Sequence, residues 1–361
     1  MIKSFTKSLA LAAALSLPLM AQPWSTTEVE AAEKTDFKVC WTIYAGWMPW
    51  GYIQESGIMK KWADKYDINV EVVQLNDYIE AINQYTAGQF DGCTMTNMDA
   101  VSIPAAGGVD STALIPGDYS DGNDGIILKD GTELADIKGD TVNLVELSVS
   151  HYFLARALDS VGLTERDIEV VNTSDADMVA AYGTDQVTSV VTWNPMLLEI
   201  LDTQDGTLVY DSSKIPGEII DIMVVNTETL KDNPDFGKAL VGAWFETMAL
   251  MQSGTPEGEE ALTKMASAAG TDLEGYKKQI AATYMFWTPD SMLEFLNSGQ
   301  VMETTEFVSE FLFSHGILGE GATSAEFVGV EMPDGEVWGE KGNVKFRYSD
   351  TLIESAAKGE L

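Results

Sequence analysis

The feature that most constrains the fold is an alternation of short apolar runs with amphipathic runs, which begins near residue 38. Short apolar runs bounded by turn residues predict buried strands, whereas apolar residues spaced three and four apart predict helices. Alternation of the two favours parallel sheets with helices on both faces. We therefore predict strands at 38–44, 68–75 and 92–96, with helices at 52–65 and 78–87 between them.

A second series of strands and helices follows the Gly/Asp-rich segment 117–124, which we expect to be a loop. Two crossings of the chain, near Gly125 and Asp221, account for the order of the elements and predict two lobes with a hinge and a cleft between them. Lobe 1 is expected at 36–124 plus 222–319, lobe 2 at 125–221, and a C-terminal extension packed on the surface at 320–361. The further predicted strands are 112–115, 125–128, 141–147, 168–171, 189–192 and 219–225, with helices at 151–161, 175–182 and through most of 227–313.

The first residues indicate export. Lys3 and Lys7 precede the apolar run 9–19, and small residues follow at Ala21 and at Ala31 and Ala32. This is the pattern of a secretory signal peptide, and the apolar run is too short for a permanent anchor. We predict a signal peptide at 1–32, cleaved between 21 and 32, and a soluble periplasmic protein without membrane insertion.

The charge balance is extreme, with 57 Asp and Glu against 21 Lys and Arg and a formal net charge of −36. A chain this acidic repels nucleic acids and anionic membranes, so both are excluded as partners. An acidic surface also suits a salt-adapted protein. Acidity alone therefore identifies no ligand.

Cysteine and histidine are scarce, with two of each in the chain. Cys40 and Cys93 end predicted strands, and neighbouring parallel strands rarely offer disulfide geometry, so two buried thiols are expected although export permits a bridge. His151 and His315 are far apart in sequence and belong to no metal-binding motif. No metal site and no cofactor are predicted.

Aromatic and acidic residues gather where the predicted strands end. Loops at the carboxyl ends of strands form the ligand sites of α/β proteins. Here these loops contain no Lys or Arg. They carry seven aromatic and six acidic residues: Tyr44, Trp47, Trp50, Tyr52, Tyr119, Tyr152 and Trp193, with Asp99, Asp118, Asp121, Asp124, Glu146 and Asp221.

An anion site would normally recruit Arg or helix N-terminal amides. An aromatic cage with carboxylates instead suits a small cation, with each cation–π contact worth about 0.5–2 kcal/mol. Packing remains an alternative for the aromatic rings, as do capping and turn formation for the acids. The predicted ligand-binding set is Tyr44, Trp47, Trp50, Thr96, Asn97, Asp99, Asp118, Glu146, Ser148, Tyr152, Trp193, Asn194 and Asp221.

Catalytic motifs are missing: the sequence has no G-x-S-x-G, no P-loop and no G-x-G-x-x-G after a strand. Ser148, Ser150 and His151 are too close in sequence to be a typical nucleophile and base. We interpret Ser148 and Ser150 as donors of hydroxyls and amides at the start of a helix. The sequence predicts a binding protein without catalytic residues.

Four segments resemble the ligand loops of one family, in the same order. They are W-M-P-W-G-Y from Trp47, D-G-C-T-M-T-N-M-D-A from Asp91, E-L-S-V-S-H-Y from Glu146 and V-T-W-N-P from Val191. They resemble the periplasmic substrate-binding proteins of ABC importers of the nitrate/sulfonate/taurine type, over nearly the whole mature chain. The resemblance is strongest to a subgroup found with urea- and guanidine-carboxylating systems.

That resemblance implies a two-lobed, type II-like periplasmic-binding-protein fold, a monomer, and delivery of a small-molecule ligand to an ABC permease. Guanidinium is the favoured ligand, because the pocket chemistry of the anion-binding members is not evident here. The alternatives are urea, taurine or nitrate as ligand, or a pyrimidine-precursor synthase of the same fold. The synthase would need a cysteine-rich iron site, and a receptor-directed signalling role is a further alternative.

Overall fold

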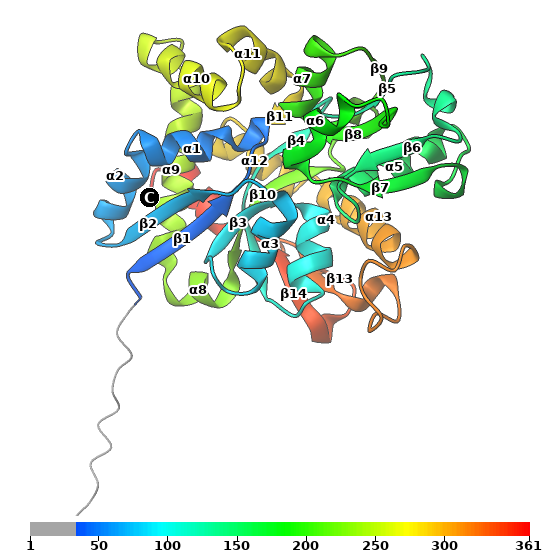
Figure 1. Ribbon diagram of the computed structural model, residues 1–361. Coiled ribbons are helices and arrows are strands. Elements are labelled where there is room, and N and C mark those ends of the chain that lie inside the picture. Colours follow the sequence, from blue (N-terminus) through cyan, green and yellow to red (C-terminus); the bar gives the residue numbers. More distant parts are fainter. Residues whose placement is uncertain (1–33) are drawn as a thin grey trace, which may run out of the picture. The chain divides into compact units, whose positions relative to one another are not determined.

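The computed structural model describes residues 34–361, so the predicted signal peptide at 1–32 lies outside the described residues. Two mixed sheets organise this part of the chain (Figure 1). The larger has the strand order β13-β12-β14-β4-β10-β3-β1-β2, with β11 paired to β4. Its strands are β1 (Asp36–Trp41), β2 (Asn69–Gln74), β3 (Gly92–Thr96), β4 (Ser111–Ser120), β10 (Ile220–Asn226), β11 (Thr283–Met285), β12 (Gly329–Glu331), β13 (Val337–Trp338) and β14 (Val344–Tyr348).

The smaller sheet has the order β7-β6-β8-β5-β9. The chain leaves the larger sheet after Ser120, enters the smaller one at Asp124, and returns at Ile220. Its strands are β5 (Asp124–Leu128), β6 (Thr141–Leu144), β7 (Glu169–Asn172), β8 (Ser189–Trp193) and β9 (Thr207–Asp211). The division into two hinged lobes remains a prediction.

Helices cover both sheets. Asp77, Thr255 and Thr288 cap three of them by accepting a hydrogen bond from a backbone N–H in the first turn. Figure 1 shows α1 and α2 (blue) beside α9, and the Lys61–Glu246 ion pair joins α2 to α9. The helices are α1 (Met48–Glu55), α2 (Ile58–Lys65), α3 (Tyr78–Thr86), α4 (Asn97–Ala100), α5 (Val149–Ser160), α6 (Met178–Tyr182), α7 (Met196–Thr203), α8 (Thr227–Asp232), α9 (Pro234–Met251), α10 (Pro256–Ala268), α11 (Leu273–Ala281), α12 (Pro289–Leu296), α13 (Gln300–Ser314) and α14 (Thr351–Ala357).

The sheets are mixed rather than parallel throughout. The runs β2-β1-β3 and β7-β6-β8 are parallel, as expected from the β/α alternation. Strands β10 and β5, which carry the chain between the sheets, are antiparallel to both of their neighbours. Parallel neighbours need a crossover connection that carries the chain back to the edge of the sheet where the first strand began. Strands β5 and β10 come directly from the other sheet without such a connection, so they pair antiparallel.

Two predicted segments differ in the structure, and two strands appear before residue 320 that were not predicted. The predicted helix 52–65 is two helices, because Gly57 adopts a left-handed conformation with φ 81° between α1 and α2. The predicted loop 117–124 is strand as far as Ser120, since this segment pairs with β10 and β11. Strands β9 and β11, which were not predicted, complete the sheets.

The C-terminal segment is part of the larger sheet, so the prediction of a surface extension is wrong. Strand β14 pairs in parallel with β4, and β12 pairs in parallel with β14. Val330, Phe346 and Ile353 are fully buried. These apolar side chains lie among many polar residues in the sequence, which conceals the short strands.

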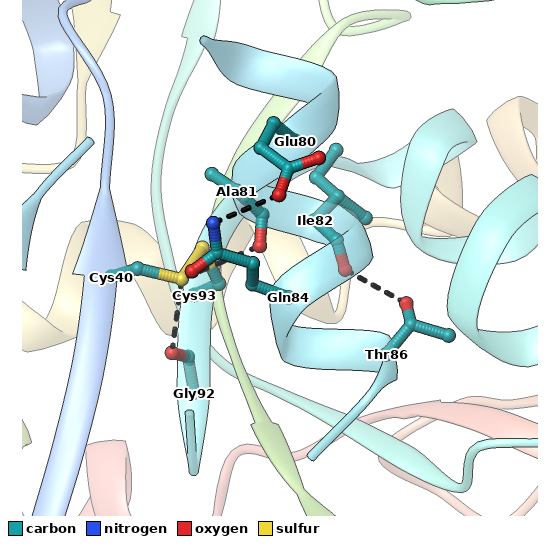
Figure 2. The surroundings of a disulfide bond; sticks show 8 residues. All are labelled: Cys40, Glu80, Ala81, Ile82, Gln84, Thr86, Gly92 and Cys93. Atoms are coloured by element: carbon teal, nitrogen blue, oxygen red, sulfur yellow. Dashed lines mark hydrogen bonds between the residues drawn. A yellow bond between two sulfur atoms is a disulfide. The ribbon is translucent and has the colours of Figure 1, made fainter. Parts of the chain in front are cut away.

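Cys40 and Cys93 form a disulfide, so the prediction of two buried thiols is wrong (Figure 2). The two residues are direct partners in the parallel register of β1 and β3, and their Cα atoms are 4.4 Å apart. That separation lies within the range a disulfide spans. Cys40 Sγ also lies 3.7 Å from the carbonyl oxygen of Ala81 in α3, so the bridge is packed beneath that helix.

Loss of this disulfide is expected to destabilise the fold by about 2–4 kcal/mol, because the bridge closes a long loop in the unfolded chain. Its cysteines are separated by 53 residues. The double variant Cys40→Ala/Cys93→Ala, compared with the parent protein by thermal unfolding, measures the change. Equal unfolding midpoints for the oxidised parent, the reduced parent and the variant would contradict the bridge.

Candidate functional site

A small enclosed pocket lies where the carboxyl ends of β3 and β8 face each other. Its volume is about 10 Å³, which is room for about one water molecule. No lysine or arginine lines it. The lining residues are Tyr44, Trp47, Tyr78, Thr96, Asp124, Val149, Trp193, Ile219 and Asp221.

Four aromatic rings form a continuous wall. The rings of Tyr44 and Trp47 meet edge to face at 5.0 Å between centroids, and Trp47 lies 5.8 Å from Tyr78. Tyr78 in turn meets Trp193 edge to face at 5.7 Å. These separations are those of favourable aromatic pairs. The wall therefore combines residues before β2, at the start of α3 and at the end of β8.

Three carboxyl groups meet beside Tyr44. Asp118 and Asp221 are direct partners in the antiparallel register of β4 and β10, and Tyr44 Oη donates to Asp118 Oδ1 at 2.9 Å. Asp124 begins β5, pairs with Trp193 in the register of β5 and β8, and accepts a 2.6 Å hydrogen bond from Ser120. All three acids are buried.

Burial without a neutralising cation determines the electrostatics. Among residues 34–361, no lysine or arginine is buried, and one oxygen each of Asp118 and Asp221 has no hydrogen-bond partner. Burial raises the pKa of Asp118 to about 7 and that of Asp124 to about 7. Burial, together with the charges of Asp118 and Asp124, raises the pKa of Asp221 well above its usual range. The cluster must therefore hold protons or a cation.

The backbone at Gly46 approaches this cluster closely. A Cβ atom at Gly46 would lie 2.4 Å from Asp118 Oδ2, closer than any side chain permits. Glycine at this position lets the aromatic segment of α1 and the turn before it pack directly against the carboxyl group.

Asp99 lies behind the wall and is bound by its neighbours. Tyr78 Oη and Thr96 Oγ1 donate to Asp99 Oδ2 at 2.6 and 2.9 Å, and the backbone N–H of Val149 donates to the same oxygen at 3.4 Å. Burial raises the pKa of Asp99 to about 6. Asp99 therefore links α4 to the start of α5 rather than lining the pocket.

Hydrogen bonds across the pocket close it. Trp193 Nε1 donates to the carbonyl oxygen of Ile43 at 3.2 Å, and the N–H of Ala45 donates to the carbonyl oxygen of Asn194 at 3.1 Å. These bonds join the segment after β1 to the segment after β8. The pocket is therefore bounded on this side by contacts between segments that are about 150 residues apart.

The structure brings five of the thirteen predicted residues to the pocket: Tyr44, Trp47, Thr96, Trp193 and Asp221. Asp118 and Asp99 stand directly behind this set. The other six lie elsewhere: Trp50, Asn97, Glu146, Ser148, Tyr152 and Asn194.

Trp50 stacks on Trp244 of α9 at 5.1 Å and is a core residue. Asn97 bonds the backbone at Glu218 and Ile220. Ser148 accepts from the N–H of Ser150 as the cap of α5. These three side chains stabilise local structure instead of facing the pocket.

Glu146 is exposed beside β6, and only its backbone N–H is bound, by Asn172. Asn194 accepts from the N–H of Leu198 at the start of α7. Tyr152 donates to Glu218 at 2.6 Å and faces a second cavity, between α5 and α13. None of the three side chains reaches the pocket.

Four lining residues were missed: Tyr78, Asp124, Val149 and Ile219. The signal for Tyr78 was present, because it lies in the segment that follows the strand at 68–75, and the same strand-end rule applies to that segment. Asp124 was recognised as a cleft acid but not selected. Ile219 precedes an antiparallel strand, so a rule based on carboxyl ends does not find it.

Within residues 34–361, no group of three or more His, Cys, Asp or Glu side chains has the arrangement to hold a metal ion. The helices of the same residues include none long and apolar enough to cross a membrane.

The sequence model of the NMT1-like family matches residues 31–267. The chain belongs to the NMT1-like family. No curated protein matches it. Its periplasmic-binding-protein-like α/β fold, the fold class expected from the sequence, is that of solved two-lobed binding proteins.

Three solved structures illustrate the fold of this NMT1-like protein. The alkanesulfonate-binding protein SsuA of Xanthomonas axonopodis pv. citri, bound to MOPS, is 14% identical with a TM-score of 0.65, covering 82% of this chain and 99% of its own. The aliphatic sulphonate-binding protein SsuA of Escherichia coli is 17% identical with a TM-score of 0.61, covering 79% and 94%. The nitrate-binding protein NrtA of Synechocystis PCC 6803 is 15% identical with a TM-score of 0.65, covering 91% and 89%.

Proposed function

We propose that this NMT1-like protein is the periplasmic solute-binding component of an ABC importer and captures a small, nitrogen-rich cation, with guanidinium the favoured ligand. The family, the fold shared with sulfonate- and nitrate-binding proteins, and a pocket closed by contacts between distant segments support the transport role. The acidic and aromatic lining of the pocket supports a positively charged ligand. Delivery to permease subunits follows from that role.

The observation that carries the ligand class is the buried group Asp118, Asp124 and Asp221 without a buried basic residue among residues 34–361. Burying several like charges is unfavourable by several kcal/mol per ion unless a counter-charge is supplied. An anion in the same pocket would add to the repulsion. A cation would remove it.

Guanidinium matches the arrangement of the pocket. It is planar and donates hydrogen bonds in its own plane, so carboxylates at its edge can accept while an aromatic ring covers its face. Asp124 and Asp221 supply the acceptors, and Trp47 and Trp193 supply faces. Because the closed pocket has a volume of about 10 Å³, its walls need to move least for the smallest ligands.

Urea is the second candidate, and Trp47 favours it. The Nε1–H of Trp47 is buried without a hydrogen-bond acceptor, and urea offers a carbonyl oxygen that guanidinium lacks. Urea has a similar shape but no charge. It would leave the carboxyl cluster to be neutralised by protons alone.

Calorimetric titration with guanidinium, urea, taurine and nitrate at fixed ionic strength tests the proposal. Fixed salt is needed because an acidic surface attracts any cation weakly when screening is low. We expect saturable 1:1 binding of guanidinium, weaker binding of urea and none of the anions. Tighter binding of taurine or nitrate than of guanidinium would refute the cationic site.

Replacing Trp47 by Leu is expected to weaken guanidinium binding by about 2- to 30-fold, the factor that corresponds to a cation–π contact of about 0.5–2 kcal/mol. Calorimetry measures the change. Trp62→Leu is the matched control, because Trp62 lies outside the pocket and bonds Glu246 on α9. Unaltered affinity in a folded Trp47→Leu variant would exclude this ring as a wall of the ligand site.

A further inference from the structure

The only two histidines of the chain contact the same carboxyl group. His151, in α5, reaches Glu165 Oε1 through Nε2, and His315, directly after α13, lies with Nε2 2.5 Å from Glu165 Oε2. Glu165 comes from the short helix η4 (Glu165–Asp167). Glu165 and His315 line a cavity of about 490 Å³ between α5 and α13. This cavity shares no lining residue with the ligand pocket. The proposed ligand site does not use this cluster.

Hydrogen-bond partners assign the protons. His315 Nδ1 lies 2.9 Å from the carbonyl oxygen of Phe311, and its Nε2 faces a carboxylate. Ser314 Oγ also lies 3.1 Å from Nδ1, but its hydroxyl donates to the carbonyl oxygen of Phe311 at 2.9 Å, so towards Nδ1 it is an acceptor. All of these partners accept, so both nitrogens carry a proton and His315 is an imidazolium. His151 differs, because its Nδ1 accepts from the N–H of Leu147 at 3.1 Å while its Nε2–H donates to Glu165. His151 therefore uses Nδ1 as an acceptor and Nε2–H as a donor.

The contact of His151 with Leu147 leads to the ligand pocket. Leu147 is a non-glycine residue with φ 62°, a conformation that costs energy and needs support from its surroundings. Two residues later, Val149 lines the pocket and its N–H donates to Asp99. The support that His151 gives to Leu147 therefore fixes the segment that carries Val149.

We propose that His151, Glu165 and His315 form a positioning relay through which α13 holds the pocket wall at Val149, and that the relay is complete only while Glu165 is ionised and His315 is protonated. The relay deepens the proposed function, because it gives the pocket a regulated wall. His151 acts through Leu147 and touches no ligand, so it is a positioning residue. The relay should therefore weaken at low pH, where Glu165 takes up a proton, and at high pH, where His315 loses one.

The charges around the cluster define the pH window. Hydrogen bonds from His151 and His315 lower the pKa of Glu165 to about 2, and the hydrogen bond to Glu165 raises the pKa of His315. The stabilisation from Glu165 is present above its unfolded pKa, near 4.5, and is lost as pH falls towards 2. That from His315 is present below 6.5 and is lost as pH rises through its raised pKa.

Other charged groups face His315 from the elements around it. Asp159 of α5 raises its pKa further, and Glu310 of α13 lines the same cavity. Arg156 of α5 lines the cavity as well, and its guanidinium is paired with Glu218 at 2.9 and 2.8 Å. Glu165, the carbonyl oxygen of Phe311 and Asp159 outweigh burial, so the pKa of His315 is raised and the imidazolium is favoured.

The test uses ligand-free protein and Glu165→Gln, with Glu310→Gln as the matched control in the same cavity. With two histidines, the imidazole NMR signals are assigned by single variants. We expect Glu165→Gln to lower the titration midpoint of His315 by about one pH unit or more. Hydrogen exchange at the Leu147 amide should accelerate about tenfold, because its acceptor is no longer held. Glu310→Gln should leave Leu147 unchanged.

His315→Gln is the second variant, since it keeps a donor near Glu165 but no charge. Slow exchange at Leu147 in both Glu165→Gln and His315→Gln would overturn the relay, as would an unchanged His315 midpoint in Glu165→Gln. These measurements need no ligand. If guanidinium fails to bind while they give the expected results, the ligand proposal fails and the relay stands.

Discussion

Asp221→Asn is expected to weaken guanidinium binding by about 30-fold to several thousand-fold while stabilising the ligand-free protein. Removing one partner of a buried charge pair costs about 2–5 kcal/mol of binding free energy. The opposite effect on folding arises because Asp221 lies directly across the β4–β10 ladder from Asp118. Folding forces the Asp221 carboxyl to take up a proton, because its pKa is raised in the folded state; an amide is neutral without that cost and can also donate to Asp118. Calorimetry and thermal unfolding measure the two effects.

Glu146→Gln is the control for this variant. It removes one negative charge from an exposed site that is outside the pocket, so it reports the effect of net charge alone. We expect near-parental affinity and stability. If Asp221→Asn binds guanidinium as tightly as the parent, the carboxylate does not contact the ligand. If it loses binding because it is unfolded, the predicted rise in stability is wrong.

Guanidinium affinity is expected to rise with pH, because the cation competes with protons held by the carboxyl cluster. Asp118 and Asp124 have pKa values raised to about 7. Below about pH 7 these groups retain protons, and each proton that a ligand displaces changes the affinity by up to about tenfold per pH unit. Titrations in buffers of different ionisation enthalpy count the released protons.

The same groups give the ligand-free protein the opposite dependence. Their unfolded pKa is near 3.8, so between about pH 4 and 7 the folded state binds more protons than the unfolded state. Their contribution to unfolding free energy therefore falls as pH rises through that window. Guanidinium should offset this loss. An affinity that is constant from about pH 5.5 to 7.5, with no proton release, would contradict a cation–carboxylate site.

The aromatic segment after the first strand shows how far sequence reasoning reached. Tyr44 and Trp47 were predicted to face a ligand site, because residues that follow a parallel strand lie at the edge of the sheet where ligands bind. Both residues line the pocket in the structure. Trp50 was predicted to lie there as well, and this was wrong in geometry. Met48 starts a helix, so Trp50 is turned towards Trp244, whose position on α9 no local pattern reveals.

For the acidic residues, too, one part could be predicted from the sequence and another part only seen in the structure. Their number and the absence of Lys and Arg in the cleft loops could be read directly, and the sign of the proposed ligand follows from them. The partnership of Asp118 with Asp221 could not be read, because it depends on the antiparallel register of strands about a hundred residues apart. The expected loop at 117–124 concealed it, since a loop has no register.

The sequence by itself determined the alternating strands and helices, the fold class, and the strand-end edge of the sheets at which the pocket lies. These depend on local periodicity and on chain direction, which the order of residues contains. Only the tertiary structure decided the Cys40–Cys93 bridge, the buried contact of Asp118 with Asp221, and the meeting of His151 and His315 at Glu165. Each of these joins side chains across strands or helices distant in sequence, so its geometry exists only once register and packing are fixed.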